Sequence, residues 1–108
     1  MANANFKDFI HRMIDFEDCR SMVVYPFEKL VEFHFFDTCE REITSSYMPV
    51  ECLETLVEEA RSLMGNRMVH NDYHLGNYVI EQNGSIYIFS ISIKDCCIKV
   101  VLNNCKFL

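Results

Sequence analysis

The sequence predicts an α+β fold in a single domain spanning residues 1–108. Two segments with apolar residues at helical spacing indicate helices, and two β-prone segments around Asn83-Gly84 indicate a hairpin. The chain has 108 residues, of which 50% are hydrophobic and 24% are charged. This balance is typical of a globular protein with one modest core.

The first predicted helix covers residues 5–16, where Phe6, Phe9, Ile10 and Met13 recur at three- and four-residue steps. The end of this segment, residues 13–16, fits a strand equally well. A turn is expected at 18–21. The β-branched run at 22–25 then predicts a short strand, which Pro26 ends.

A dense aromatic segment at 33–36, with His34 inside it, indicates core or a covered face. The clearest helix runs from Pro49 to Met64, because Pro favours a first helical position and Gly65 suits a C-cap. Its apolar residues keep helical spacing throughout: Val50, Leu53, Leu56, Val57, Ala60, Leu63 and Met64.

Beyond this helix, residues 78–80 and 86–89 flank Asn83-Gly84, which provides the positive φ angles of a tight hairpin turn. Residues 98–102 predict one more strand. The six cysteines have no C-x-x-C spacing, so we expect reduced thiols instead of disulfides or a zinc site.

The net charge of −6 gives no electrostatic footprint for nucleic acid or an anionic membrane, so we expect neither partner. The chain also has no apolar run near the ~20 residues that a membrane-spanning helix needs. We therefore expect a cytoplasmic protein in a reducing compartment, or one in the host cytoplasm if it comes from a pathogen.

One motif carries chemistry: His70, Asp72 and Asn77 form the pattern H-x-D-x-x-x-x-N. Phosphoryl transfer needs a carboxylate that orients the attacking hydroxyl and oxygen ligands that hold magnesium against the phosphates. Asp72 suits the first role and Asn77 the second, while His70 can brace the loop.

This region resembles the catalytic loop of the protein-kinase-like superfamily. It is closest in style to aminoglycoside phosphotransferases, lipopolysaccharide-core kinases and bacterial-effector kinases. The resemblance implies that residues 10–18 form the strand before the hinge strand and that 22–28 form the hinge strand and hinge. It also implies that 49–64 form the long helix before the catalytic loop, and that 78–89 form the hairpin carrying the magnesium aspartate.

The same resemblance implies site residues. Asp72 and His70 would be the catalytic pair, Asn77 would bind metal, and Tyr25 and Phe27 would contact nucleotide at the hinge. The family's second aspartate falls on Ser90, a poor ligand for a hard dication. With no glycine before Gly65, most of the ATP-covering lobe is missing, as are the lower helices. We therefore expect a truncated kinase-like fold in which binding of ATP and Mg²⁺ is weak or absent.

The leading hypothesis is a pseudokinase that acts as a binding or regulatory module on a kinase or its substrate, with residues 33–36 as contact surface. One alternative is a residual phosphotransferase, with Asp72 as base and Asn77 as metal ligand, completed by a partner chain or by self-association. Another is a metal site formed by His70, Asp72 and His74, which share a face if that segment is extended. A homodimer is also predicted, through exposed strand edges at 22–25 and 98–102.

Overall fold

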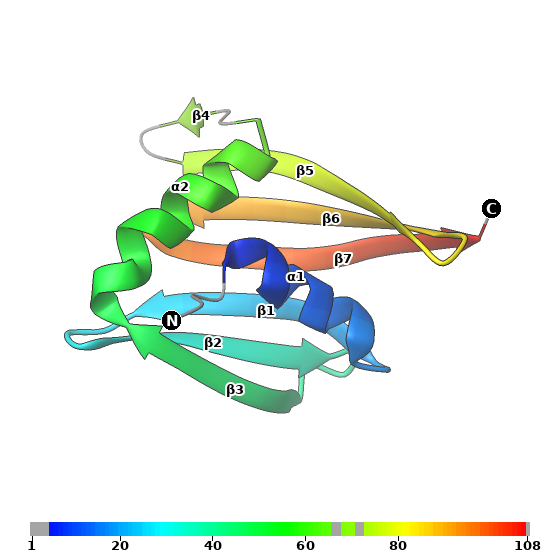
Figure 1. Ribbon diagram of the computed structural model, residues 1–108, viewed down its shortest axis with the longest axis horizontal. Coiled ribbons are helices and arrows are strands. Elements are labelled where there is room, and N and C mark those ends of the chain that lie inside the picture. The colour runs from blue at the N-terminus through cyan, green and yellow to red at the C-terminus, as the bar shows by residue number, and fades with distance from the viewer. Residues whose placement is uncertain (1–4, 66–67, 71–72, 108) are drawn as a thin grey trace.

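A single antiparallel sheet of seven strands, in the order β3-β2-β1-β7-β6-β5-β4, forms the body of the molecule (Figure 1). The computed structural model describes residues 5–65, 68–70 and 73–107, with 68–70 and 104–107 described only by their place in strands. Helices and strands together confirm the α+β class. In chain order, the elements are α1 (Phe6–Asp15), β1 (Cys19–Pro26), β2 (Leu30–Asp37), β3 (Glu42–Pro49), the 3₁₀ turn η1 (Val50–Cys52), α2 (Leu53–Leu63), β4 (Met68–His70), β5 (Tyr73–Gln82), β6 (Ser85–Lys94) and β7 (Cys97–Phe107).

Helix α1 begins with a capping box at its first turn. The Asn5 side chain accepts a hydrogen bond from the Asp8 N–H, and the Asp8 carboxylate accepts one from the Asn5 N–H. The helix buries one apolar side, made of Phe6, Phe9, Ile10 and Met13. The strand that the kinase resemblance implied at 10–18 is wrong, because this cap and apolar spacing keep residues 10–15 helical.

The second predicted helix is confirmed, with a 3₁₀ first turn at Val50–Cys52 before α2. Pro49 precedes this turn with a φ of −59°, the angle that its ring enforces. After Leu63 the chain leaves the helix at Gly65, whose φ of +82° is left-handed. Residues 50–65 thus form the helix and C-cap that their sequence pattern predicted.

The predicted hairpin is also confirmed, and it is longer than the sequence indicated. Asn83 and Gly84 take φ angles of +52° and +77° between β5 and β6. Both central residues of a type I′ turn need such positive φ values. The two strands pair along their whole length, from Gln82–Ser85 at the turn to Tyr73–Lys94 at the far end.

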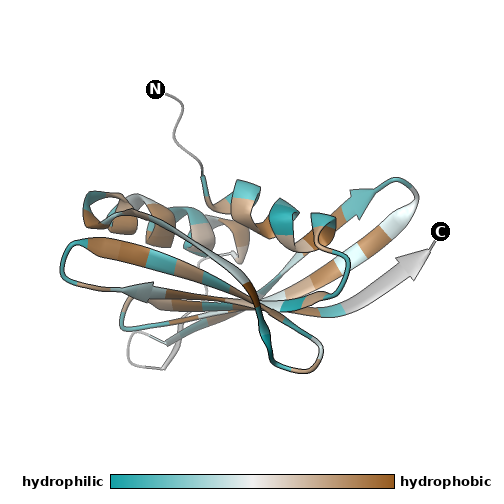
Figure 2. Ribbon diagram, turned by 90° about the horizontal axis from the view of Figure 1, so that it is seen from below, coloured by the Kyte–Doolittle hydropathy of each residue, from teal (hydrophilic) through white to brown (hydrophobic). Residues whose placement is uncertain are grey.

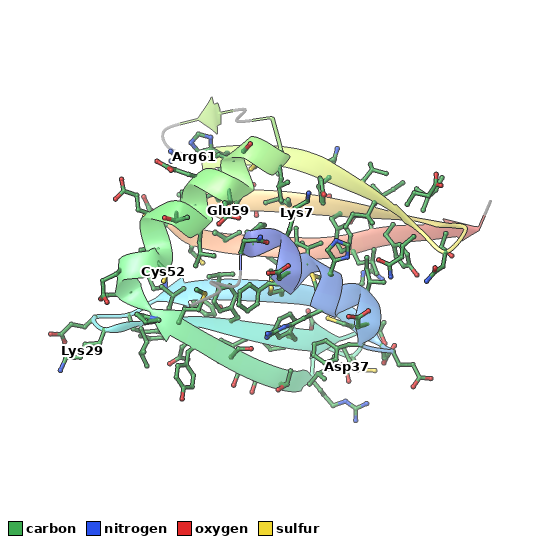
Figure 3. The ribbon with its side chains drawn as sticks, viewed as in Figure 1. Lys7, Lys29, Asp37, Cys52, Glu59 and Arg61 are labelled. Carbon is green, nitrogen blue, oxygen red and sulfur yellow. The ribbon has the colours of Figure 1, made fainter. Side chains whose placement is uncertain are left out.

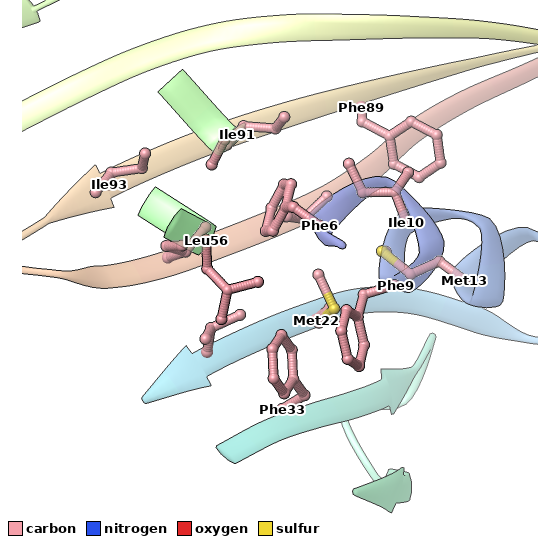
Figure 4. Close-up of a cluster of buried hydrophobic side chains, with 14 of the residues drawn as sticks. Phe6, Phe9, Ile10, Met13, Met22, Phe33, Leu56, Phe89, Ile91 and Ile93 are labelled. Atoms are coloured by element: carbon pink, nitrogen blue, oxygen red, sulfur yellow. The ribbon is translucent and has the colours of Figure 1, made fainter. Parts of the chain in front are cut away.

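Both helices pack on the same side of the sheet (Figure 2), and the hydrophobic core lies between them and the strands (Figure 4). Within it, the rings of Phe9 and Phe33 stack with centroids 3.8 Å apart. Phe33 and Phe35 are both 0% exposed. The prediction that residues 33–36 form a contact surface is therefore wrong for these two, because alternation along β2 turns them toward the helices.

The strands that were predicted as exposed edges lie in the middle of the sheet. β1 pairs with β2 on one side and β7 on the other, and β7 also pairs with β6. The edge assignment for 22–25 and 98–102 is therefore wrong, because each segment uses the backbone groups on both of its sides. β3 and β4 form the two ends of the sheet.

Neither α1 nor α2, the helices in the described part of the chain, has the length and apolar character needed to cross a membrane.

Candidate functional site

The motif residues lie on strands. His70 ends β4, and Asn77 lies in the middle of β5, opposite Ser90. Asp72 lies outside the described residues. The catalytic loop predicted for 70–77 is therefore wrong at least for residues 73–77, which form the first half of β5. The physical reason is the hairpin ladder, which pairs each of these five residues with one on β6.

Asn77 and Ser90 are brought together, as the resemblance required, but by strand pairing. The two positions are equally far from the Asn83-Gly84 turn, so the hairpin sets them side by side. The Ser90 hydroxyl donates to Asn77 Oδ1 at 3.4 Å, and Asn103 Nδ2 donates to Ser90 Oγ. This cluster offers neutral amide and hydroxyl oxygens to a ligand.

No group of three or more His, Cys, Asp or Glu side chains suited to holding a metal occurs among the described residues. Asn77, predicted as a metal ligand, has neutral partners in the cluster just described. His74, from the alternative metal site, is only 6% exposed. It lies on the opposite face of β5 from Asn77, because the two residues are three positions apart. The structure thus separates His74 from the polar cluster.

The predicted hinge residues lie far from Asn77 across the sheet. Tyr25 is near the end of β1, and Phe27 follows that strand in the turn to β2; they are 43% and 53% exposed. β7 and β6 stand between β1 and β5. With strands about 4.8 Å apart, β1 and β5 are separated by about 14 Å. The structure therefore does not join the hinge residues and Asn77 in one site.

What the motif search missed is the side of the sheet turned away from both helices, which we call the open face (Figure 2). Its side chains alternate with the buried ones along each strand, and this alternation is the signal that could have revealed it. Tyr47 and Val79 are the most exposed large apolar residues on it, at 70% and 56%. The open face includes Ser21, Val23, Tyr25, Glu32, His34, Phe36, Ile43, Ser45, Tyr47, Leu75, Asn77, Val79, Ser90, Ser92, Lys99 and Asn103.

The apolar part of the open face forms two patches. One lies on β1–β3 around Tyr25 and Tyr47, and the other lies on β5 around Leu75 and Val79. Between them, β6 and β7 present the polar residues Ser90, Ser92, Lys99 and Asn103 together with the half-buried Ile88 and Val101. The Asn77–Ser90–Asn103 cluster lies at the border with β5. A protein surface with apolar patches beside satisfied polar groups is typical of interaction sites.

His34 is the main titratable group on the first patch. Its Nε2 lies 2.9 Å from Glu32 Oε1, and its Nδ1 contacts the Glu42 carboxylate. The Tyr25 ring meets it edge-on, with centroids 5.9 Å apart. The hydrogen bond with Glu42 raises the pKa of His34 above its ordinary value of 6.5; burial opposes this rise, and Glu32 adds to it.

This cluster predicts a pH-dependent stability. Because the folded state holds the proton more tightly, the stabilisation is fully present below pH 6.5 and is lost as the pH rises through the higher folded pKa. We expect the free-energy difference of unfolding between the wild type and His34→Gln to shrink over that rise. Urea denaturation at a series of pH values measures it; a difference that grows with pH would contradict the assignment. Val23→Thr, at a position paired with His34 on the same face, is the control and should leave the pH profile unchanged.

The five described cysteines are free thiols, as the sequence predicted for them. Burial raises the pKa of the Cys19 thiol to about 11, so Cys19 stays protonated near neutral pH. Cys39 and Cys96 are exposed. None of these five cysteines is a strand-pairing partner of Asn77 or Ser90.

A separate hollow of about 250 Å³ lies on the helical side, at the start of α2. Asn5, Met48, Cys52, Leu56 and Glu59 are among the residues that line it. Figure 3 labels two of them: Cys52, at the end of the 3₁₀ turn η1, and Glu59, further along in α2. Glu59 already accepts a hydrogen bond from the Phe6 N–H at 3.3 Å, so this carboxylate helps to dock α1 against α2.

The chain matches no model of a known protein family, and no curated protein matches it.

Proposed function

We propose that this chain is a non-catalytic binding module that recognises a protein partner through the open face of its sheet. The observation that carries the proposal is the exposure of aromatic and aliphatic side chains on that face, led by Tyr25, Tyr47, Leu75 and Val79. Burying such patches against a partner removes apolar surface from water and favours association.

The negative charge of the chain favours a partner that has positively charged residues. The net charge is −6, and the first patch includes the carboxylates of Glu32 and Glu42 around His34. An apolar segment flanked by Lys or Arg complements this surface in hydrophobicity and in charge. A kinase or a kinase substrate remains the specific partner that the sequence resemblance predicts.

The kinase-derived origin stays a prediction. The adjacency of Asn77 and Ser90 agrees with it. The position of Asn77 within a strand, and the helix at residues 10–15, weigh against it. No contact among the described residues favours the residual phosphotransferase or the metal site over a binding role.

The test combines partner identification with quantitative binding. A protein captured from lysate by the wild-type chain is purified and titrated calorimetrically against the wild type, the double variant Leu75→Ser/Val79→Ser, and Glu58→Ser as control. Leu75 and Val79 are 40% and 56% exposed, so the double variant should fold normally. Loss of the two exposed apolar side chains of the second patch is expected to weaken binding about tenfold or more. Glu58, exposed on α2, should have no effect.

Two outcomes would overturn the proposal. One is equal affinity for the wild type, the double variant and a Tyr25→Ser/Tyr47→Ser variant of the first patch, which would place binding away from the open face. The other is magnesium-dependent ATP binding that strengthens in Ser90→Asp, because that change would restore the family's metal ligand beside Asn77. The same titration set, with ATP and magnesium as titrant, detects the second outcome.

A further inference from the structure

β3 is an end strand of the sheet, so one side of its backbone has no strand partner among the described residues (Figure 1). Natural edge strands are usually protected by charged residues, Pro or bulges in the strand. From Ile43 to Met48, β3 has no charged residue and no Pro, since its sequence reads Ile-Thr-Ser-Ser-Tyr-Met. The register shift opposite Phe35 and Phe36 lies at the start of the strand, between Glu42 and Thr44. From Thr44 to Met48 the outer side of the strand is therefore open to another strand.

The ladder fixes which backbone groups of β3 face outward. The Val50 N–H donates to the Lys29 carbonyl, which makes 29 and 50 a hydrogen-bonded pair at the end of the β2–β3 ladder. Because such pairs alternate in antiparallel strands, positions 44, 46 and 48 also direct their N–H and C=O groups toward β2. Ser45 and Tyr47 thus direct theirs away from the sheet, as does the Ile43 carbonyl, because it points opposite to the Thr44 N–H in the same trans peptide unit.

The β1–β2 ladder independently shows which backbone groups of β2 face β3. The Phe27 N–H donates to the Leu30 carbonyl, so the even-numbered residues of β2 face β1. The odd-numbered residues of β2, including Phe33 and Phe35, must then face β3. Their partners there are Ser46 and Thr44, as the first ladder requires.

The outward-facing backbone groups of β3 can pair with the same groups of a second copy of the chain. We propose that two copies of this chain pair through β3, antiparallel about a two-fold axis at Ser45, to form one continuous sheet. In this register Ser45 faces Ser45 of the second copy, and Ile43 faces Tyr47. The Ser45 N–H of each copy meets the Ser45 carbonyl of the other, and each Tyr47 N–H meets an Ile43 carbonyl, so the outward N–H groups of Ser45 and Tyr47 are paired at the junction.

The side chains agree with this register. Ile43 and Tyr47, which are 39% and 70% exposed, become cross-strand neighbours on the open face. On the helical side, Thr44 faces Ser46, a pairing of two hydroxyl side chains. Arg12 Nη1 donates to Ser46 Oγ at 3.1 Å and so holds that side chain against its own chain. Because the two-fold axis is perpendicular to the sheet, both open faces point the same way in the dimer.

Position 45 allows a sharp test, because only the residue on the axis faces itself. Ser45→Lys alone and Ser45→Glu alone each set two like charges opposite one another and should give monomers. An equal mixture of the two variants should restore a dimer through a Lys–Glu pair. Ser45→Ala keeps the N–H and is the matched control, expected to dimerise like the wild type. Sedimentation equilibrium measures the mass against the chain mass of 12.8 kDa.

A monomeric wild type overturns the proposal. So does a dimer that persists in both charged variants, since the contact would then lie elsewhere. If the charged variants fail to fold, hydrogen exchange of the wild type provides the second readout. The amides of Ser45 and Tyr47 should exchange more slowly in concentrated than in dilute solution, while Thr44 should not change; equal exchange at all concentrations overturns the dimer.

This inference goes beyond the proposed binding function and is tested separately. The Leu75→Ser/Val79→Ser variant alters β5, which lies at the other side of the sheet from β3. It should therefore lose partner binding and keep the dimer, whereas Ser45→Lys should lose the dimer.

Discussion

Replacing Phe33 with alanine is expected to lower the free energy of unfolding by about 3–5 kcal/mol. Phe33 is 0% exposed on the helical side of β2, and its ring stacks on Phe9 of α1 with centroids 3.8 Å apart. Truncation removes this contact and leaves a cavity between α1 and the sheet. The loss is a large fraction of the ~5–15 kcal/mol that stabilises a typical domain.

Urea denaturation followed by circular dichroism measures this effect from the shift of the midpoint. Phe36→Ala is the matched control, because Phe36 lies on the same strand but on the open face, without a covering helix. Its cost should be clearly smaller. Phe33→Leu should fall between the two and provides a value if Phe33→Ala does not fold. Equal losses at positions 33 and 36 would contradict the assignment of the two faces.

Replacing Gly76 with alanine is expected to cost about 2 kcal/mol or more. A Cβ at this position would lie 2.5 Å from the Met64 carbonyl oxygen and 2.7 Å from Met64 Cβ. Since one of these atoms belongs to the backbone, the end of α2 must move away from β5 to make room. Gly76 therefore permits close helix–sheet packing, a structural role for a residue that the sequence assigned to a catalytic motif.

Gly65→Ala is the informative comparison. Gly65 has a φ of +82° and nothing within 4 Å of its added Cβ, so its replacement costs backbone strain alone, about 1 kcal/mol. The larger loss should therefore come from Gly76→Ala, measured by urea denaturation of both variants. A Gly76→Ala protein as stable as the wild type would show that α2 does not contact β5 at this point.

Local sequence signals predicted the elements that are stabilised locally. The apolar spacing of 50–64, with Pro49 before it and Gly65 after it, gave the second helix. The Asn83-Gly84 turn gave the hairpin, because positive φ at two adjacent positions is a property of the turn itself. The prediction of free thiols is also confirmed for Cys19, Cys39, Cys52, Cys96 and Cys97.

Signals that depend on distant partners were read wrongly. Residues 70–77 have a catalytic-loop motif, yet 73–77 pair with β6 and form a strand. The edge prediction for residues 22–25 and 98–102 is wrong because nothing local reveals that these segments pair with each other. The residues of 33–36 could not be divided between core and surface until the helices defined the buried side of β2.

By itself, the sequence determined the α+β class, the second helix and the tight hairpin, because a few neighbouring residues set their backbone angles. Only the tertiary structure decided which strands are central, which face stays open and where Asn77 lies. Those features depend on ladders between residues far apart in the chain and on the side of the sheet that α1 and α2 cover. The open face and the β3 edge, where the proposed functions lie, exist only at that level.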